Sequence, residues 1–127
     1  MMLLDSNIII YAAKPEHAFL RQLIAENAPA VSAVSLVEVL GFHKLSDAER
    51  QHFEAFFAAS TVLPLSGALI TQAVKLRQIR KMSLGDSFVG ATALVHNRTL
   101  VTRNTKDFAW VAGLRLLNPF EGTSATP

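Results

Sequence analysis

Short apolar runs alternate along the chain with longer segments in which apolar residues recur at helical spacing. The runs at residues 2–4, 30–33, 61–65, 99–102 and 114–117 are predicted to be β-strands. The longer segments predict helices at 7–13, after Pro15 through Ile24, and at 35–42, 46–59, 66–81 and 84–97, with a short helix near Asp107. Wholly apolar strands separated by helices are typical of a parallel sheet covered on both faces. The pattern therefore predicts an α/β fold, a three-layer sandwich with a parallel sheet of about five strands.

Composition narrows the class of protein without identifying it. The 127 residues suit one domain, predicted at 1–121 with a flexible tail at 122–127, and a half-apolar composition excludes disorder as the main state. The absence of cysteine excludes disulfides and thiolate metal sites and fits a cytoplasmic protein. A formal charge of +2 is too small to indicate a nucleic-acid partner.

Two apolar segments resemble targeting or membrane signals but are not predicted to be such. The N-terminus lacks a basic region and is interrupted by Asp5, which argues against a signal peptide. Residues 55–74 carry no charge, yet Pro64 and the Ser66-Gly67 pair divide them into a strand, a turn and a helix start. We therefore expect no membrane-spanning segment.

Four carboxylates stand near predicted helix starts, and each has an ordinary structural explanation. Asp5 directly follows the first strand, where it can cap the next helix. Glu38 and Asp86 each lie three residues after a serine, the spacing of a capping box. Asp107 follows the fourth strand through a polar turn in which Asn104 can cap a short helix.

Taken together, the four acids also predict a metal site. The helices that carry Glu38 and Asp86 are otherwise poor in charge, and parallel strands bring Asp5 and Asp107 to the same edge of the sheet. Grouped carboxylates raise one another's pKa, and a divalent cation relieves that repulsion. Oxygen ligands without cysteine suit Mg²⁺ or Mn²⁺, which can activate water for attack on phosphorus.

Basic residues gather just before the Asp86 helix. Arg77, Arg80 and Lys81 share one face of the predicted 66–81 helix, and Arg103 and Lys106 lie beside Asp107. These side chains are candidates for contact with RNA phosphates. A merely solubilising helix face explains the first three equally well.

Four segments resemble, in order, the acidic motifs of PIN-domain ribonucleases. They read LLDSNIIIY at 3–11, SLVEVLG at 35–41, DSFVGATAL at 86–94 and LVTRNTKDF at 100–108. The likeness extends over residues 2–119, and the size and motif order are similar to VapC-type toxins of bacterial toxin–antitoxin pairs. Ser6 stands where the family commonly has Thr, and Gly90 where it often has Ala, but neither difference removes a carboxylate.

The resemblance implies a function and a set of site residues. Asp5, Glu38, Asp86 and Asp107 would line one pocket and bind one or two Mg²⁺ or Mn²⁺ ions, some through water, with Asp5 and Asp86 as direct ligands. Ser6, Thr102 and Asn104 would position these groups by hydrogen bonds. The reaction would be hydrolysis of an RNA phosphodiester by metal-activated water. The family also implies a homodimer and a cognate antitoxin that blocks the site.

Two alternative hypotheses fit the sequence less well. A catalytically silent PIN-like scaffold that binds RNA or a partner is disfavoured because all four acids are present. A phospho-accepting signalling domain needs an acceptor Asp at the end of a middle strand, and neither 30–33 nor 61–65 ends in Asp. Setting the four acids aside leaves six acidic residues against twelve basic ones, so the small net charge can hide an acidic pocket within a basic surface.

Overall fold

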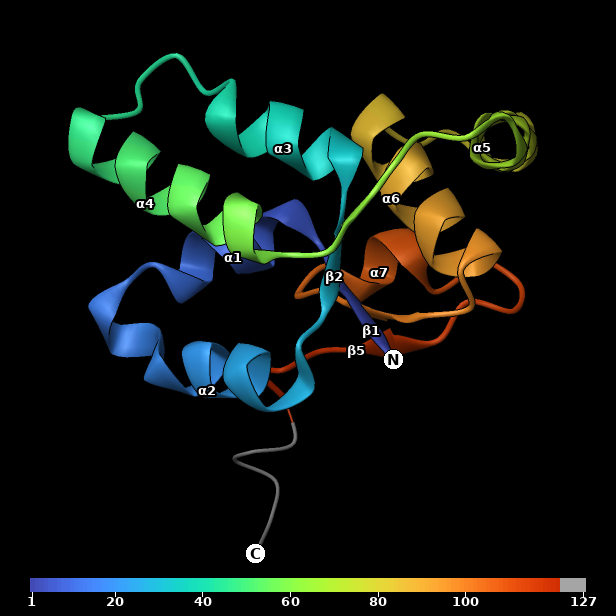
Figure 1. Cartoon of the computed structure of the whole chain (residues 1–127). Helices are drawn as coiled ribbons and strands as arrows, with labels where there is room; N and C mark the ends of the chain where they lie inside the picture. The colour runs from blue at the N-terminus through green and yellow to red at the C-terminus, as the bar shows by residue number, and fades with distance from the viewer. Residues whose placement is uncertain (122–127) are drawn as a thin grey trace, which may run out of the picture.

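Five short strands form one parallel sheet at the centre of the computed structural model, which describes residues 1–121 (Figure 1). Their order in the sheet is β3-β2-β1-β4-β5. The strands are β1 (Met2–Leu4), β2 (Ala30–Ser32), β3 (Val62–Leu63), β4 (Thr99–Val101) and β5 (Leu116–Leu117). The predicted α/β class and parallel sheet are confirmed, while the predicted tail at 122–127 lies outside the described residues.

Seven α-helices and one 3₁₀ turn connect the strands, close to where the sequence predicts them. They are α1 (Ser6–Ala12), the 3₁₀ turn η1 (Pro15–His17), α2 (Ala18–Asn27), α3 (Ala33–Leu40), α4 (Asp47–Ala59), α5 (Gly67–Ile79), α6 (Leu84–Val95) and α7 (Thr105–Phe108). None of the helices within residues 1–121 is long and apolar enough to span a membrane.

The central strand β1 explains why the strands read as continuous apolar runs. Leu3 and Leu4 are both completely buried but belong to different core clusters, because successive side chains of a strand point to opposite faces. Leu4 packs in a cluster with residues of α1, α2 and α4, including Ile8, Leu20 and Phe53. On the other face, Leu3 packs with residues of α6.

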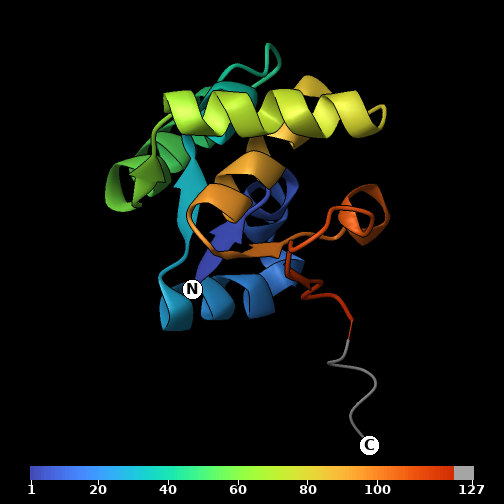
Figure 2. The ribbon, with the colours of Figure 1, turned by 90° about the vertical axis from the view of Figure 1, so that its right-hand side faces the viewer.

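Helix α5 forms an additional layer outside α6 (Figure 2). Leu69, Ala73 and Leu76 of α5 are buried against Ala91 of α6 and Val111. Gly90 of α6 faces the same interface, where an added Cβ would lie 3.5 Å from Leu76, at ordinary van der Waals distance. The small residues of α6 thus bring α5 and its basic end next to the carboxyl edge of the sheet.

Several predicted boundaries are wrong by one to three residues, each for a local reason. Strand β3 stops before Pro64, which has no backbone N–H to donate. Strand β5 begins only at Leu116, because Gly113 has a φ of 81° and Leu114 closes a turn onto the Val111 carbonyl.

Helix α5 also ends earlier than predicted. Its last residue is Ile79, and Arg80 has an extended backbone. Arg77, Arg80 and Lys81 therefore do not share one helix face, because the segment from Arg80 onwards is the connection to α6.

Helix α3 starts before the predicted residue 35. The Ser32 hydroxyl accepts a hydrogen bond of 3.2 Å from the Val34 N–H and caps the helix. Ser35 is therefore not the N-cap, and the capping box predicted for Ser35 and Glu38 is wrong. A complete capping box occurs instead at the start of α4, between Ser46 and Glu49.

Candidate active site

Asp5 joins the central strand to the first helix and is nearly buried, with 5% of its surface exposed. Its Oδ1 accepts a hydrogen bond of 2.8 Å from the Ser6 N–H, and its Oδ2 accepts one of 2.8 Å from the Thr102 hydroxyl. Burial raises the pKa of Asp5, the two hydrogen bonds lower it, and the charges of Glu38 and Asp107 raise it again. Asp5 is thus both the predicted helix cap and a carboxylate held beside two others.

Glu38 is attached to the same site through serine hydroxyls. Ser6 Oγ lies 2.7 Å from Glu38 Oε1 and 2.8 Å from Ser35 Oγ. A hydroxyl has only one proton, so both hydrogen bonds form together when Ser35 donates to Ser6 and Ser6 donates to Glu38. Ser35, which is completely buried, therefore orients Ser6 rather than capping α3.

Asp86 lies in the first turn of α6, where the Ser83 hydroxyl accepts a hydrogen bond of 3.1 Å from its N–H. This forms the serine half of the predicted capping box. Burial, followed by the charges of Asp5 and Asp107, raises the pKa of Asp86 from its ordinary 3.8 to about 6. A hydrogen bond with Ser83 opposes this shift, and Glu38 adds to it.

Gly85, the residue before Asp86, leaves space for the Glu38 carboxylate at the start of α6. A Cβ added to Gly85 would lie 2.4 Å from Glu38 Oε2, closer than any real contact. The Glu38 carboxylate therefore rests on the glycine backbone at the start of α6. The absence of a side chain at position 85 lets two of the four acids share one site.

The loop after β4 supplies the fourth carboxylate. Asp107 lies in α7, and its N–H bonds to the Asn104 carbonyl at 3.1 Å. The Asn104 side chain makes no capping hydrogen bond, but the backbone N–H of Asn104 donates to the Thr102 hydroxyl at 3.0 Å. Since the same hydroxyl donates to Asp5, the loop and the central strand are connected through Thr102.

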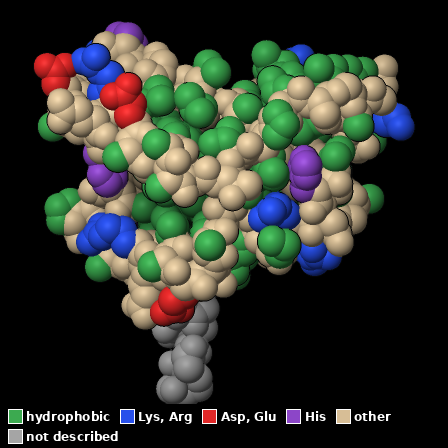
Figure 3. Space-filling view, in the orientation of Figure 1, with side chains coloured by type: hydrophobic (Ala, Val, Ile, Leu, Met, Phe, Trp, Pro, Cys, Tyr) green, Lys and Arg blue, Asp and Glu red, His purple; other side chains and the backbone are tan. Residues whose placement is uncertain are grey.

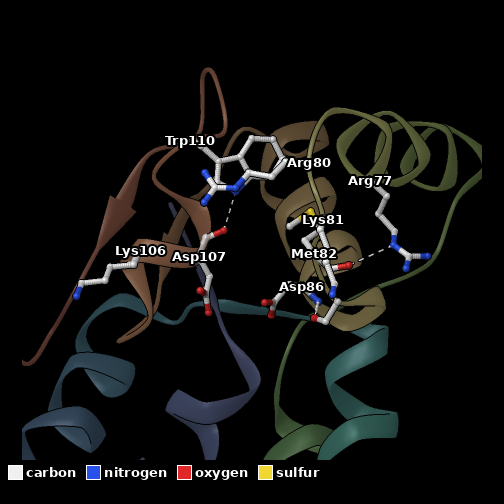
Figure 4. Close-up of a pocket in the computed structure, with 9 residues that line it drawn as sticks. Arg77, Arg80, Lys81, Met82, Asp86, Lys106, Asp107 and Trp110 are labelled. Carbon is white, nitrogen blue, oxygen red and sulfur yellow. Dashed lines mark hydrogen bonds between the residues drawn. The ribbon is translucent and has the colours of Figure 1, made fainter.

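The fold thus brings the four predicted acids together from distant parts of the chain. Asp86 is affected electrostatically by Asp5, Asp107 and Glu38, and its carboxylate points toward that of Asp107 in Figure 4. Within residues 1–121, no group of three or more Asp, Glu or His side chains is arranged to hold a metal ion. Mg²⁺ usually takes only one or two protein carboxylates and keeps several waters, so this donor set still fits such an ion.

Basic side chains surround the two outer acids. Asp86 and Asp107 line a pocket of about 590 Å³ whose other lining residues are Arg77, Arg80, Lys81, Met82, Ser83, Lys106 and Trp110 (Figure 4). Among residues 1–121, the only ion pair is between Asp47 and Arg50, so none of the four cations is neutralised by a carboxylate. Four of the five predicted RNA contacts therefore meet at this pocket.

Arg103 lies elsewhere. Its guanidinium carbon is 4.1 Å from the ring centroid of Phe120 and 5.4 Å from that of Tyr11. These rings fix the loop after β4 against α1 and the last described segment of the chain.

Sequence reasoning missed three residues of the site. Ser35 and Gly85 both lie within segments that have the spacing of a capping box. That pattern explains a serine three residues before an acid, so it gave no reason to expect any further contact. Trp110 follows Asp107 by three residues, and its indole Nε1 donates to the Asp107 carbonyl at 2.9 Å. The three-residue spacing between Asp107 and Trp110 could have indicated this contact. It does so only once α7 is known to be a single helical turn.

Comparison with known proteins agrees with the overall fold. The family model of the PIN domain matches residues 2–114. A chain of a toxin–antitoxin complex from Klebsiella pneumoniae is 30% identical, with a TM-score of 0.76 over 95% of this chain and 99% of the other. A chain of DNA-bound VapBC from Salmonella typhimurium is 20% identical, with a TM-score of 0.82 over 93% and 97% of the two chains.

A chain of FitAcB from Neisseria gonorrhoeae, 24% identical, gives a TM-score of 0.74 over 95% of this chain and 99% of that chain. Among curated proteins, none matches the sequence. The resemblance stated from the four acidic motifs is confirmed by the family model and by the 30% identical structure. The chain therefore belongs to the PIN domain family.

Proposed function

We propose that this protein is an Mg²⁺- or Mn²⁺-dependent endoribonuclease that acts in the cytoplasm as the toxin of a toxin–antitoxin pair. The observation that carries the proposal is the grouping of Asp5, Glu38, Asp86 and Asp107 at one edge of the sheet. Burial, and after it the repulsion between these carboxylates, raises the pKa values of Asp5 and Asp86. A bound divalent cation would offset both effects.

Asp5 and Asp86 are the proposed direct ligands, and Glu38 and Asp107 would act partly through water. The cation would supply a water of lowered pKa for attack on phosphorus and would stabilise the leaving oxygen. Thr102 and Ser6 hold Asp5 and Glu38 through the hydrogen bonds described above, while Asn104 contributes its backbone N–H to Thr102. These contacts reduce the reorganisation that the site needs on binding.

The unpaired cations at the pocket are the proposed phosphate contacts. Arg77, Arg80, Lys81 and Lys106 face the same cavity as Asp86 and Asp107. A polyanion drawn to them would pass the carboxylates, which by themselves repel it. Arg103 would contact RNA farther along the loop, from its position over Phe120.

Exposed apolar side chains support a protein partner as well. Val37 and Leu84 are 70% and 58% exposed, and each is adjacent in sequence to one member of the Glu38–Gly85 contact. Ile70, Val74 and Ile79 of α5 are exposed as well, and Figure 3 shows hydrophobic side chains on the surface over α5. We propose that an antitoxin segment covers the apolar edge of the site and that α5 belongs to a homodimer interface.

The test of the proposed function is cleavage of total RNA by the purified protein with Mg²⁺ or Mn²⁺ and after EDTA treatment. Asp5→Asn and Asp86→Asn keep the side-chain shape but remove ligand charge, and each is expected to lower the rate by about 10²-fold or more. Asp47→Asn, which changes an exposed acid on α4, serves as the control. Equal cleavage by all four proteins, or cleavage unaffected by EDTA, would refute the proposal. RNA binding without metal and without cleavage would instead identify a silent scaffold.

A further inference from the structure

Trp110 is the only tryptophan of the chain, and it lines the pocket beside Asp86 and Asp107. The hydrogen bond from its indole N–H to the Asp107 carbonyl fixes the ring relative to that acid. The ring is partly buried against the core cluster that contains Leu76 and Val111. A large aromatic group is therefore held in a fixed orientation within the proposed active site.

Arg80 lies over this ring. Its guanidinium carbon is 5.7 Å from the ring centroid, and Figure 4 shows the two side chains next to each other at the top of the pocket. Arg80 is exposed and, within the described residues, pairs with no carboxylate. Its backbone is extended because α5 has already ended, which directs the residue away from the α5 helix face.

We infer that Trp110 and Arg80 form a binding site for one nucleobase next to the bond that is cut. Bases stack on aromatic rings and on arginine guanidinium planes, and such stacking tolerates any base. A solubilising role would not require an arginine to lie on the only indole of the pocket. Lys81 and Lys106, which line the same pocket, are in reach of the neighbouring phosphates.

This inference rests on the proposed function and specifies its substrate. A base that stacks here must first leave its own stack, so the site favours single-stranded or looped RNA over duplex RNA. Asp86 and Asp107 then face the adjoining backbone, while the Trp110–Arg80 pair holds the base. The expected ligand class is thus an unpaired nucleotide within an RNA strand.

The experiment uses the fluorescence of Trp110 in the Asp86→Asn protein with EDTA present, so that the RNA stays intact during the titration. A labelled single-stranded oligoribonucleotide is titrated, and fluorescence anisotropy of the label reports binding independently of the tryptophan signal. Saturating single-stranded RNA is expected to quench Trp110, whereas the same sequence in a duplex or with an abasic site at the contact leaves the signal nearly unchanged. Binding by anisotropy without quenching would overturn the inference while leaving the proposed function intact.

Two substitutions provide a second measurement. Arg80→Lys keeps the charge but loses the planar group, and Trp110→Phe keeps a smaller ring that maintains the fold. Each is expected to weaken single-stranded RNA binding by about 3- to 30-fold and duplex binding much less. Arg50→Lys makes the same chemical change on the exposed face of α4 and is the matched control. Equal affinities of all variants for single-stranded RNA would contradict the inference, and absence of RNA binding by every protein would refute it together with the proposed function.

Discussion

The hydroxyl of Thr102 donates a hydrogen bond of 2.8 Å to Oδ2 of Asp5, and so links the ends of two neighbouring strands, β4 and β1. Both side chains are buried, and Thr102 also accepts from the Asn104 N–H. One hydroxyl therefore fixes the orientation of the central carboxylate and the start of the loop that carries Asp107.

Replacing Thr102 by Val is expected to leave Asp5 and the Asn104 N–H without this partner. Loss of a buried hydrogen bond to a carboxylate costs about 1–3 kcal/mol of unfolding free energy, and the pKa of Asp5 rises further. Denaturant unfolding and RNA cleavage rates test both effects. Thr102→Ser retains the hydroxyl and should remain close to wild type; equal loss in Ser and Val variants would show that shape, not the hydrogen bond, matters.

The raised pKa of Asp86 predicts how stability depends on pH without metal. The folded protein holds a proton up to about pH 6, whereas the unfolded chain releases it near 3.8, so this residue makes the fold less stable as pH rises through that window. Asp86→Asn removes the penalty. Melting temperatures in EDTA should therefore show the variant gaining on wild type between pH 4 and pH 7. A constant difference across this range would contradict the assignment.

Metal binding should reverse that penalty. At neutral pH, Mg²⁺ or Mn²⁺ is expected to raise the melting temperature of the wild type with increasing concentration. The corresponding gain in unfolding free energy is about 2.7 kcal/mol at 100 times the dissociation constant. Asp86→Asn should lose most of this gain, while Asp47→Asn should keep it. Equal metal stabilisation of wild type and Asp86→Asn would place the binding site elsewhere.

Gly85 gives a test of the position of Glu38. A methyl group at position 85 would displace the Glu38 carboxylate, so Gly85→Ala is expected to lower cleavage by about 10-fold although Ala favours a helix by about 1 kcal/mol. Gly67→Ala, also in the first turn of a helix, is the control because nothing lies within 4 Å of its added Cβ. Thermal melts would show both variants folded, and equal activity of the two would mean that Glu38 does not need its present position.

The fold was predictable because buried apolar residues dominate its central strands. Leu3, Leu4, Leu100 and Val101 are completely buried and leave an unbroken apolar signal, and the strand order of the sheet then places Asp5 next to the end of β4. The four acids could be identified because they interrupt charge-poor helices. The sequence pattern could not show which hydroxyl forms a hydrogen bond with which carboxylate. The spacing of Ser35 and Glu38 fits a capping box, although Ser35 in fact forms its hydrogen bond with Ser6.

The pocket was only partly predictable for a different reason. The basic residues at the end of α5 were assigned to one helix face, but the helix stops at Ile79, so Arg80 and Lys81 line the pocket of Asp86 from the connection to α6. The contact between Arg80 and Trp110 joins residues thirty positions apart and has no signature in local periodicity. Such contacts depend on where a helix ends, which sequence patterns determine least well.

Strand β1 has only three residues, and the next residue is Asp5. A shift of this strand by one position would exchange the two core faces and expel a leucine from each, so its register is fixed by packing on both sides. Asp5 follows the buried strand without any intervening loop. The position of its carboxylate is therefore fixed by the packing of the core. It follows that a partly folded chain lacks the assembled carboxylates. The proposed cleavage of RNA would then arise only when the centre of the sheet is complete.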